Sequence, residues 1–81
     1  MDNRQKEFYA SLENTFMTPG WNLITEGWRQ EQAALPEAAF FNAKSMEDIE
    51  AIRVRYGLLD ELIRLPDTIE QQKLDVINQH E

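Results

Sequence analysis

Three prolines divide this 81-residue chain into segments in which apolar side chains recur every three or four positions. Such spacing places the apolar side chains on one face of an α-helix, whereas a half-buried strand alternates at every second residue. Proline fits the first turn of a helix and interrupts a helix further along. We therefore predict an all-α fold, a small bundle of three to four helices at about 3–16, 19–34, 46–65 and 67–79, with a break near 36–42.

Side chains that can cap a helix precede three of the expected helices. Asp2 stands before the first helix, and Thr18 stands immediately before Pro19 at the start of the second. Ser45 opens the third helix, and Asp48 follows three residues later, where a capping box has its reciprocal acceptor. The segment around Thr18 and Pro19 therefore predicts one tight corner that ends the first helix and begins the second.

The expected helices differ in their apolar faces. In the first, Phe8, Leu12 and Phe16 recur every four residues, with Tyr9 beside this stripe. The second carries two tryptophans one heptad apart, which form a large aromatic anchor. The helix at 46–65 has the most regular apolar face, with intervals of three and four over two heptads. Its residues are Ile49, Ile52, Tyr56, Leu59 and Ile63.

The chain carries 15 acidic and 8 basic side chains, a formal net charge of −7. This balance argues against a surface that binds phosphates, so we expect no direct nucleic-acid partner. No stretch approaches the roughly 20 apolar residues of a membrane helix, and charged residues within 1–17 interrupt any apolar signal-peptide core. We expect a single helical domain, residues 1–81, made in the cytoplasm of its producing cell without a membrane partner.

No combination of residues points to a reaction. The lone histidine, His80, stands next to the C-terminus, and the chain has no cysteine that could share a metal with it. The acidic pairs Glu47-Asp48 and Asp60-Glu61 are adjacent in sequence, so their side chains point about 100° apart on a helix. No glycine-rich phosphate loop follows a strand. We therefore predict no enzymatic activity, no cofactor, no metal site and no catalytic residue.

Two glycines, Gly27 and Gly57, fall inside expected helices, where each costs about 1 kcal/mol relative to alanine. A glycine allows another backbone or a large ring to come unusually close. The close contact can lie inside the monomer, between the second and third helices, or at an interface with another molecule. Of these two interpretations we favour the contact inside the monomer.

Because no combination of residues points to a reaction or a metal site, the predicted role is protein–protein interaction. A domain of 81 residues without disulfides gains little net stability from its own core, so a protein partner or a second copy can add to it. Large aromatic residues are typical anchors of protein interfaces. The candidate interface residues are Trp21, Trp28, Phe40, Tyr56, Gly27 and Gly57.

Three stretches of packing and turn residues carry a resemblance to a known group of proteins. They are the corner Phe16 to Trp21, the segment Asn42 to Ser45 leading into Glu47-Asp48-Ile49, and the segment Arg55 to Pro66. Together they resemble the small all-helical proteins of tailed bacteriophages, especially short-tailed ones, some of which are taken to be minor virion components. The resemblance spans roughly residues 16–70 and supplies no functional residues.

The resemblance implies a structural role, in which the chain attaches to the capsid, portal or tail of a phage particle, with phage subunits or a second copy as partner. Two alternatives stay open. One is a protein that only dimerises through its third helix. The other is an acidic inhibitor or regulator that occupies a basic site on a host nucleic-acid enzyme. The acidic residues of such a mimic are Glu47, Asp48, Glu50, Asp60 and Glu61.

Overall fold

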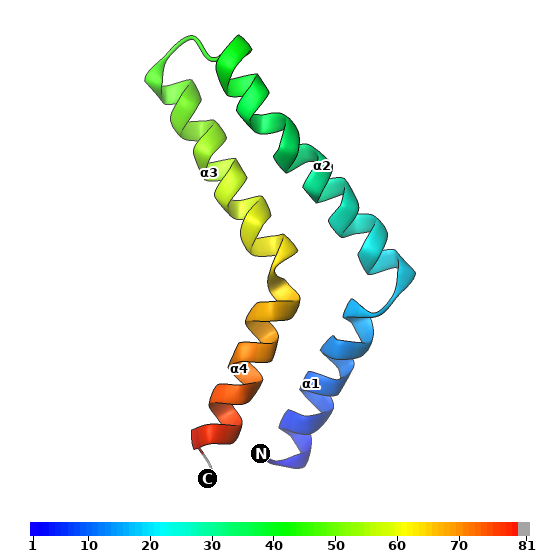
Figure 1. Cartoon of the computed structure of the whole chain (residues 1–81). Coiled ribbons are helices and arrows are strands. Elements are labelled where there is room, and N and C mark those ends of the chain that lie inside the picture. Colours follow the sequence, from blue (N-terminus) through cyan, green and yellow to red (C-terminus); the bar gives the residue numbers. More distant parts are fainter. Residues whose placement is uncertain (80–81) are drawn as a thin grey trace. The chain divides into compact units, whose positions relative to one another are not determined.

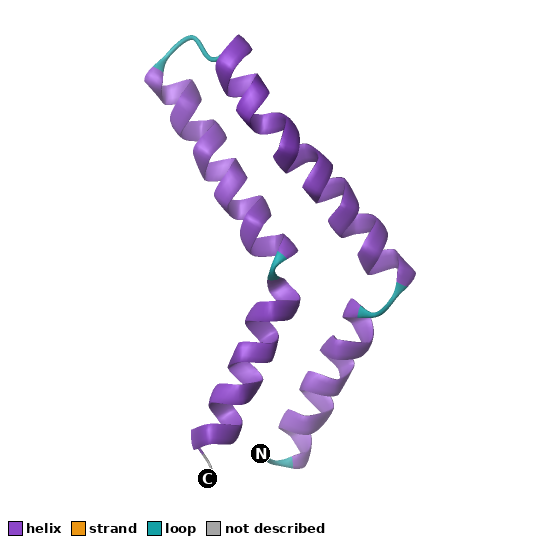
Figure 2. Ribbon diagram, viewed as in Figure 1, coloured by secondary structure: helices purple, strands orange, loops and turns teal. Residues whose placement is uncertain are grey.

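The computed structural model describes residues 1–79, which contain four α-helices and no strand. Figure 1 labels the helices, and Figure 2 shows the short connections between them. They are α1 (Asn3–Phe16), α2 (Pro19–Asn42), α3 (Met46–Ile63) and α4 (Leu65–Gln79). The predicted all-α class is confirmed for this part of the chain.

The chain divides into two compact units, each described in turn. Unit 1 runs from Met1 to Leu23 and again from Arg64 onward, so it contains α1, the first turn of α2, and α4. Unit 2 is Ile24–Ile63, the rest of α2 together with α3. The single domain expected from the length stays a prediction.

In unit 1, α1 and α4 lie side by side (Figure 1). Asp2 caps α1, since its carboxylate accepts the Gln5 N–H at 2.8 Å and the Gln5 side chain accepts the Asp2 N–H at 3.1 Å. Tyr9 is buried. Lys73 Nζ lies 2.7 Å from Glu13 Oε1. The ion pair therefore joins the mostly polar helix α4 to α1.

Unit 2 is a helical hairpin. α2 and α3 run side by side in opposite directions and are joined by residues 43–45 (Figure 2). Gln32 Nε2 donates to the Tyr56 carbonyl oxygen at 3.3 Å and to Asp60 Oδ1 at 3.2 Å. Arg55 forms an ion pair with Glu31. These polar contacts fix which side of α3 faces α2.

Few side chains of unit 2 are buried. Among its residues only Thr25 of α2 and Leu59 of α3 are. Leu59 belongs to the apolar face predicted for α3, and Ile52 and Ile63 of that face are half-buried. The predicted face therefore does meet α2, and it gives the hairpin a narrow core.

The predicted break near 36–42 is wrong, because α2 continues through Pro36 to Asn42 as one helix. A proline in a helix interior removes one backbone hydrogen bond and costs about 3 kcal/mol. Alanine, leucine and glutamate, all strong helix formers, flank this proline on both sides. Contacts of Glu31 and Gln32 with α3 hold α2 one turn before it. Together these offset the missing bond.

The boundary between α3 and α4 lies two residues earlier than predicted. α3 ends at Ile63 and α4 begins at Leu65. Pro66 is then the second residue of α4, a position where its missing N–H breaks no intrahelical hydrogen bond. The Thr68 N–H donates to the Arg64 carbonyl at 3.0 Å and closes the first turn.

The predicted caps of α2 and α3 are confirmed. Thr18 Oγ1 accepts the Trp21 N–H at 3.1 Å, and Ser45 Oγ accepts the Asp48 N–H at 3.2 Å. The Asp48 carboxylate accepts the N–H of Lys44, at 2.9 Å, rather than that of Ser45. The cap of α3 is therefore a capping box displaced by one residue on its reciprocal side.

Candidate interaction surface

Three large apolar side chains are exposed at the connection between α2 and α3. Phe40 is 82 % exposed, Phe41 71 % and Met46 75 %. The two phenyl rings meet edge to face, with centroids 4.9 Å apart. We call Phe40, Phe41 and Met46 the tip residues. A group of exposed apolar side chains marks an interaction site more often than a single one does.

Helix geometry explains this exposure. Phe40 and Phe41 are neighbours on α2, so their side chains point about 100° apart and cannot both turn toward α3. α2 ends one residue later, and Met46 is the first residue of α3. The tip residues thus stand at the connected end of the hairpin, where neither helix extends far enough to cover them.

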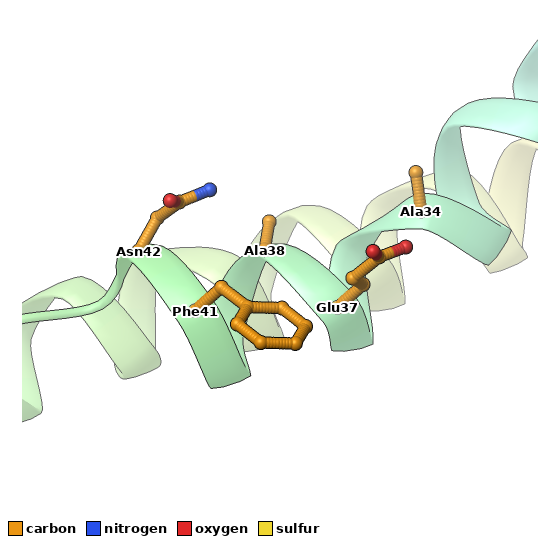
Figure 3. A pocket seen from close by; sticks show the side chains of 5 residues that line it. All are labelled: Ala34, Glu37, Ala38, Phe41 and Asn42. Carbon is orange, nitrogen blue, oxygen red and sulfur yellow. The ribbon is translucent and has the colours of Figure 1, made fainter.

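Phe41 also borders a shallow hollow of about 340 Å³ on the surface of α2 (Figure 3). The lining residues are Ala34, Glu37, Ala38, Phe41 and Asn42. The hollow exists because the short side chains of Ala34 and Ala38 do not fill the space beside the phenyl ring. Ligand pockets enclose a small molecule from several sides, whereas one helix supplies this entire lining. The hollow therefore suits a protruding side chain of another protein.

α3 exposes a second apolar side, distinct from the face that meets α2. Leu58 is 52 % exposed, whereas its neighbour Leu59 is 4 % exposed. Val54 is exposed as well, and so is Ala51. Ala51, Val54 and Leu58 follow at intervals of three and four and therefore share one side of the helix. We call these three residues the α3 strip.

The predicted aromatic interface residues lie in different settings. Trp21, in unit 1, is half-buried and packs against Phe16, with ring centroids 4.9 Å apart. Trp28, in unit 2, is half-buried, and Tyr56 is partly exposed beside the middle of the hairpin. Phe40 stands at the connected end of the hairpin, more than three helical turns beyond Trp28. Within unit 2 these three aromatic residues form no single patch.

Both predicted glycines are exposed. A side-chain carbon added at Gly27 or Gly57 would meet no atom of another helix within 4 Å. Among the described residues, the close contact that we favoured between the second and third helices is therefore absent, and that interpretation is wrong. The interface interpretation of the two glycines stays a prediction.

The predicted interface set omits Phe41, Met46, Val54 and Leu58. The sequence does contain a signal for two of them, because Val54 and Leu58 fall outside the spacing of the apolar face that includes Leu59. An apolar residue off the buried face of a regular helix has nothing to meet in a two-helix hairpin. Phe41 carries a weaker signal, its adjacency to Phe40. Met46 carries none beyond its place beside the cap.

The acidic residues of α3 do not form one free surface. Three of them have partners within the chain: a backbone N–H in the cap, an amide side chain of α2, and an arginine one turn away. These are Asp48, Asp60 and Glu50, respectively. Glu47 and Glu61 have no hydrogen bond or ion pair with any residue in 1–79. A continuous row of free carboxylates is thus not present on this helix.

The described residues offer little else for chemistry. Within 1–79 no group of three or more histidine, cysteine or acidic side chains could hold a metal ion. His80 lies outside the described residues. The hydrogen bond to Glu13 raises the pKa of Lys73, and the charge of the same carboxylate acts in the same direction. This ion pair links two helices and is part of the structure of unit 1.

No protein family, curated protein or solved structure matches this chain. None of the described helices is both long and apolar enough to cross a membrane. The tip residues and the α3 strip are the two groups of exposed apolar side chains in unit 2 that the fold itself does not cover.

Proposed function

We propose that this chain is a non-enzymatic protein–protein interaction module whose unit 2 hairpin binds another protein through the tip residues. The observation that carries the proposal is the exposure of Phe40, Phe41 and Met46 at one end of a hairpin with a narrow core. Aromatic residues and methionine are enriched at protein interfaces, and aromatic anchors dominate the binding energy of many of them.

The hollow beside Phe41 supports the same role. Interface anchors act in pairs, in which a projecting side chain of one protein enters a small depression of the other. The hairpin end offers both elements within about two turns of helix, the exposed phenyl rings and the alanine-lined hollow (Figure 3). A partner with a complementary depression and a protruding apolar side chain would cover both.

Within this class, we propose that the chain is a minor virion or assembly protein of a tailed phage, bound to the capsid, portal or tail. The support is the resemblance of the corner at 16–21 and of the segments 42–49 and 55–66 to small helical phage proteins. The segment 42–49 contains the connection on which the tip residues stand.

The acidic-inhibitor proposal has less support. A mimic of nucleic acid needs a row of carboxylates that are free to meet a basic site. On α3 only Glu47 and Glu61 lack a partner among the described residues, and they stand near opposite ends of the helix.

Mass spectrometry of purified particles of the phage that carries the gene tests the virion role. We expect the wild-type chain in stoichiometric amounts. The double variant Phe40→Ser/Phe41→Ser should be depleted at least about tenfold, the order expected when interface anchors are removed. Leu23→Ser, which changes an exposed residue of unit 1, is the matched control. Absence of the wild-type chain would refute the virion role, and full incorporation of the double variant would refute the tip as its contact.

A further inference from the structure

We infer that the α3 strip docks a cationic amphipathic helix of a partner protein. This inference rests on the proposed interaction role and assigns a second contact surface to it. Ala51, Val54 and Leu58 lie on the side of α3 that does not face α2, because the polar contacts of Arg55, Tyr56 and Asp60 turn the other side toward α2.

The strip is bounded by a carboxylate at each end. Glu47 precedes Ala51 by four residues, and Glu61 follows Leu58 by three, so both continue the same line along the helix. The two glutamates are two heptads apart, which corresponds to about 21 Å along the axis. Neither forms an ion pair within the described part of the chain. The α3 strip is therefore an apolar surface with an unpaired carboxylate at each end.

The arginines of α3 do not neutralise these acids. Arg55 pairs with Glu31 of α2. Arg53 Nη1 lies 3.6 Å from Glu50 Oε2, one turn away on the same helix. Neither arginine of α3 pairs with Glu47 or Glu61, so both carboxylates are available to cationic side chains of another molecule.

Charge decides which occupant fits the strip. A second copy in parallel would place Glu47 opposite Glu47, and an antiparallel copy would place Glu47 opposite Glu61, so like charges would meet in either arrangement. A partner helix with an apolar stripe and lysine or arginine two heptads apart would meet an opposite charge at both ends. An amphipathic helix docks through apolar residues at intervals of three and four, which is also the spacing of the strip.

A pair of synthetic peptides tests the inference on the full-length protein. The first is an amphipathic helix of about 18 residues, or five turns, with leucines at intervals of three and four and lysines two heptads apart. The second has glutamate in place of each lysine. Fluorescence anisotropy of the labelled peptides, titrated with the protein at low and at physiological salt, measures binding. We expect saturable binding of the lysine peptide and at least about tenfold weaker binding of the glutamate peptide.

Variants locate the site without disturbing the fold, because the residues changed are exposed. Val54→Ser and Leu58→Ser should each weaken binding of the lysine peptide about tenfold, since both keep the charge and remove an apolar contact. Glu47→Gln/Glu61→Gln should weaken it about threefold to tenfold and reduce its salt dependence. Leu23→Ser in unit 1 is the matched control and should change it less than about twofold.

Three results would overturn the inference. The first is binding that Val54→Ser and Leu58→Ser leave unchanged, which would mean non-specific attraction to an acidic protein. The second is binding that Phe40→Ser/Phe41→Ser removes instead, which would place the cationic helix on the tip residues. The third is a dimer in sedimentation equilibrium that Leu58→Ser dissociates, which would make a second copy the occupant. None of these refutes the interaction role of the tip residues, which particle incorporation tests separately.

Discussion

Unit 1 and unit 2 each hold helices side by side, but their apolar residues meet different surroundings. In unit 1, the exposed large apolar side chains are spread over three helices and the turn that follows α1: Phe8, Met17, Leu23 and Leu74. In unit 2 they are more numerous and include the tip residues and most of the α3 strip. They are Ile24, Phe40, Phe41, Met46, Val54, Tyr56 and Leu58.

This difference follows from how many sides of each helix are apolar. A helix in a two-helix pair can turn only one side toward its partner. α4 has few apolar residues, and the contact with α1 accounts for most of its packing. α3 has apolar residues on two sides, and α2 provides a surface for only one of them. Surplus apolar surface in unit 2 is therefore a property of its sequence, and it is the basis of the binding role that we propose for this unit.

The largest effect should separate two adjacent leucines of α3. Leu59→Ala removes a buried side chain from the narrow core of unit 2 and should lower the free energy of unfolding by about 2–4 kcal/mol. Leu58→Ala changes a residue of the exposed strip and should stay within about 0.5 kcal/mol of wild type. Urea unfolding followed by circular dichroism measures both. Equal losses for the two variants would mean that Leu58 is buried in solution and that the contrast between the two sides of α3 is wrong.

An intermediate effect should come from the proline in α2. Pro36→Ala restores a backbone hydrogen bond within the helix and should raise the free energy of unfolding by roughly 1–2 kcal/mol, after the loss of the proline's restriction on the unfolded chain. Amide hydrogen exchange around residues 36–42 should slow in parallel. Destabilisation by this substitution would contradict a continuous α2 and would favour the break that the sequence suggested.

The smallest effect concerns unit 1 and depends on pH. A lysine whose pKa is raised in the folded state contributes stability that is fully present below its ordinary value of 10.5 and is lost as the pH rises past the folded value. Lys73→Met should therefore be less stable than wild type near neutral pH. The difference should shrink as the pH rises well above 10.5. Thermal unfolding of both proteins across this range measures it, and a difference that does not depend on pH would point to lost packing of the side chain.

The sequence predicted the helices and their caps well, because both depend on local spacing and on single capping residues. Asp2, Thr18 and Ser45 each cap the helix they were expected to cap. It failed at Pro36, since the cost of an interior proline competes with helix formers on both sides and with contacts to α3. That competition depends on tertiary structure and cannot be seen in the local pattern.

Which residues are buried was harder to predict from the sequence. The expected stripe of α1 contains Phe8, yet Phe8 is exposed and its neighbour Tyr9 is buried. A stripe of apolar residues does not specify which of its edges meets the partner helix. Phe41 and Met46 were not predicted for a related reason, because the exposure of the tip residues depends on where the hairpin ends. By contrast, the off-face positions of Val54 and Leu58 could have been recognised from spacing alone.

The most direct test of the account is the accessibility of the tip in the isolated protein and in the cell. The chain contains no cysteine, so Asn42→Cys introduces a single thiol beside the tip residues and keeps both phenyl rings, and its reaction rate with a maleimide reports exposure at that site alone. Leu23→Cys, at an exposed position of unit 1, serves as the reference. We predict rapid labelling of both variants in the purified protein, and selective protection of Asn42→Cys in cells that produce the protein naturally. Slow labelling of Asn42→Cys in the purified protein, or equal labelling of the two variants in the cell, would contradict the account.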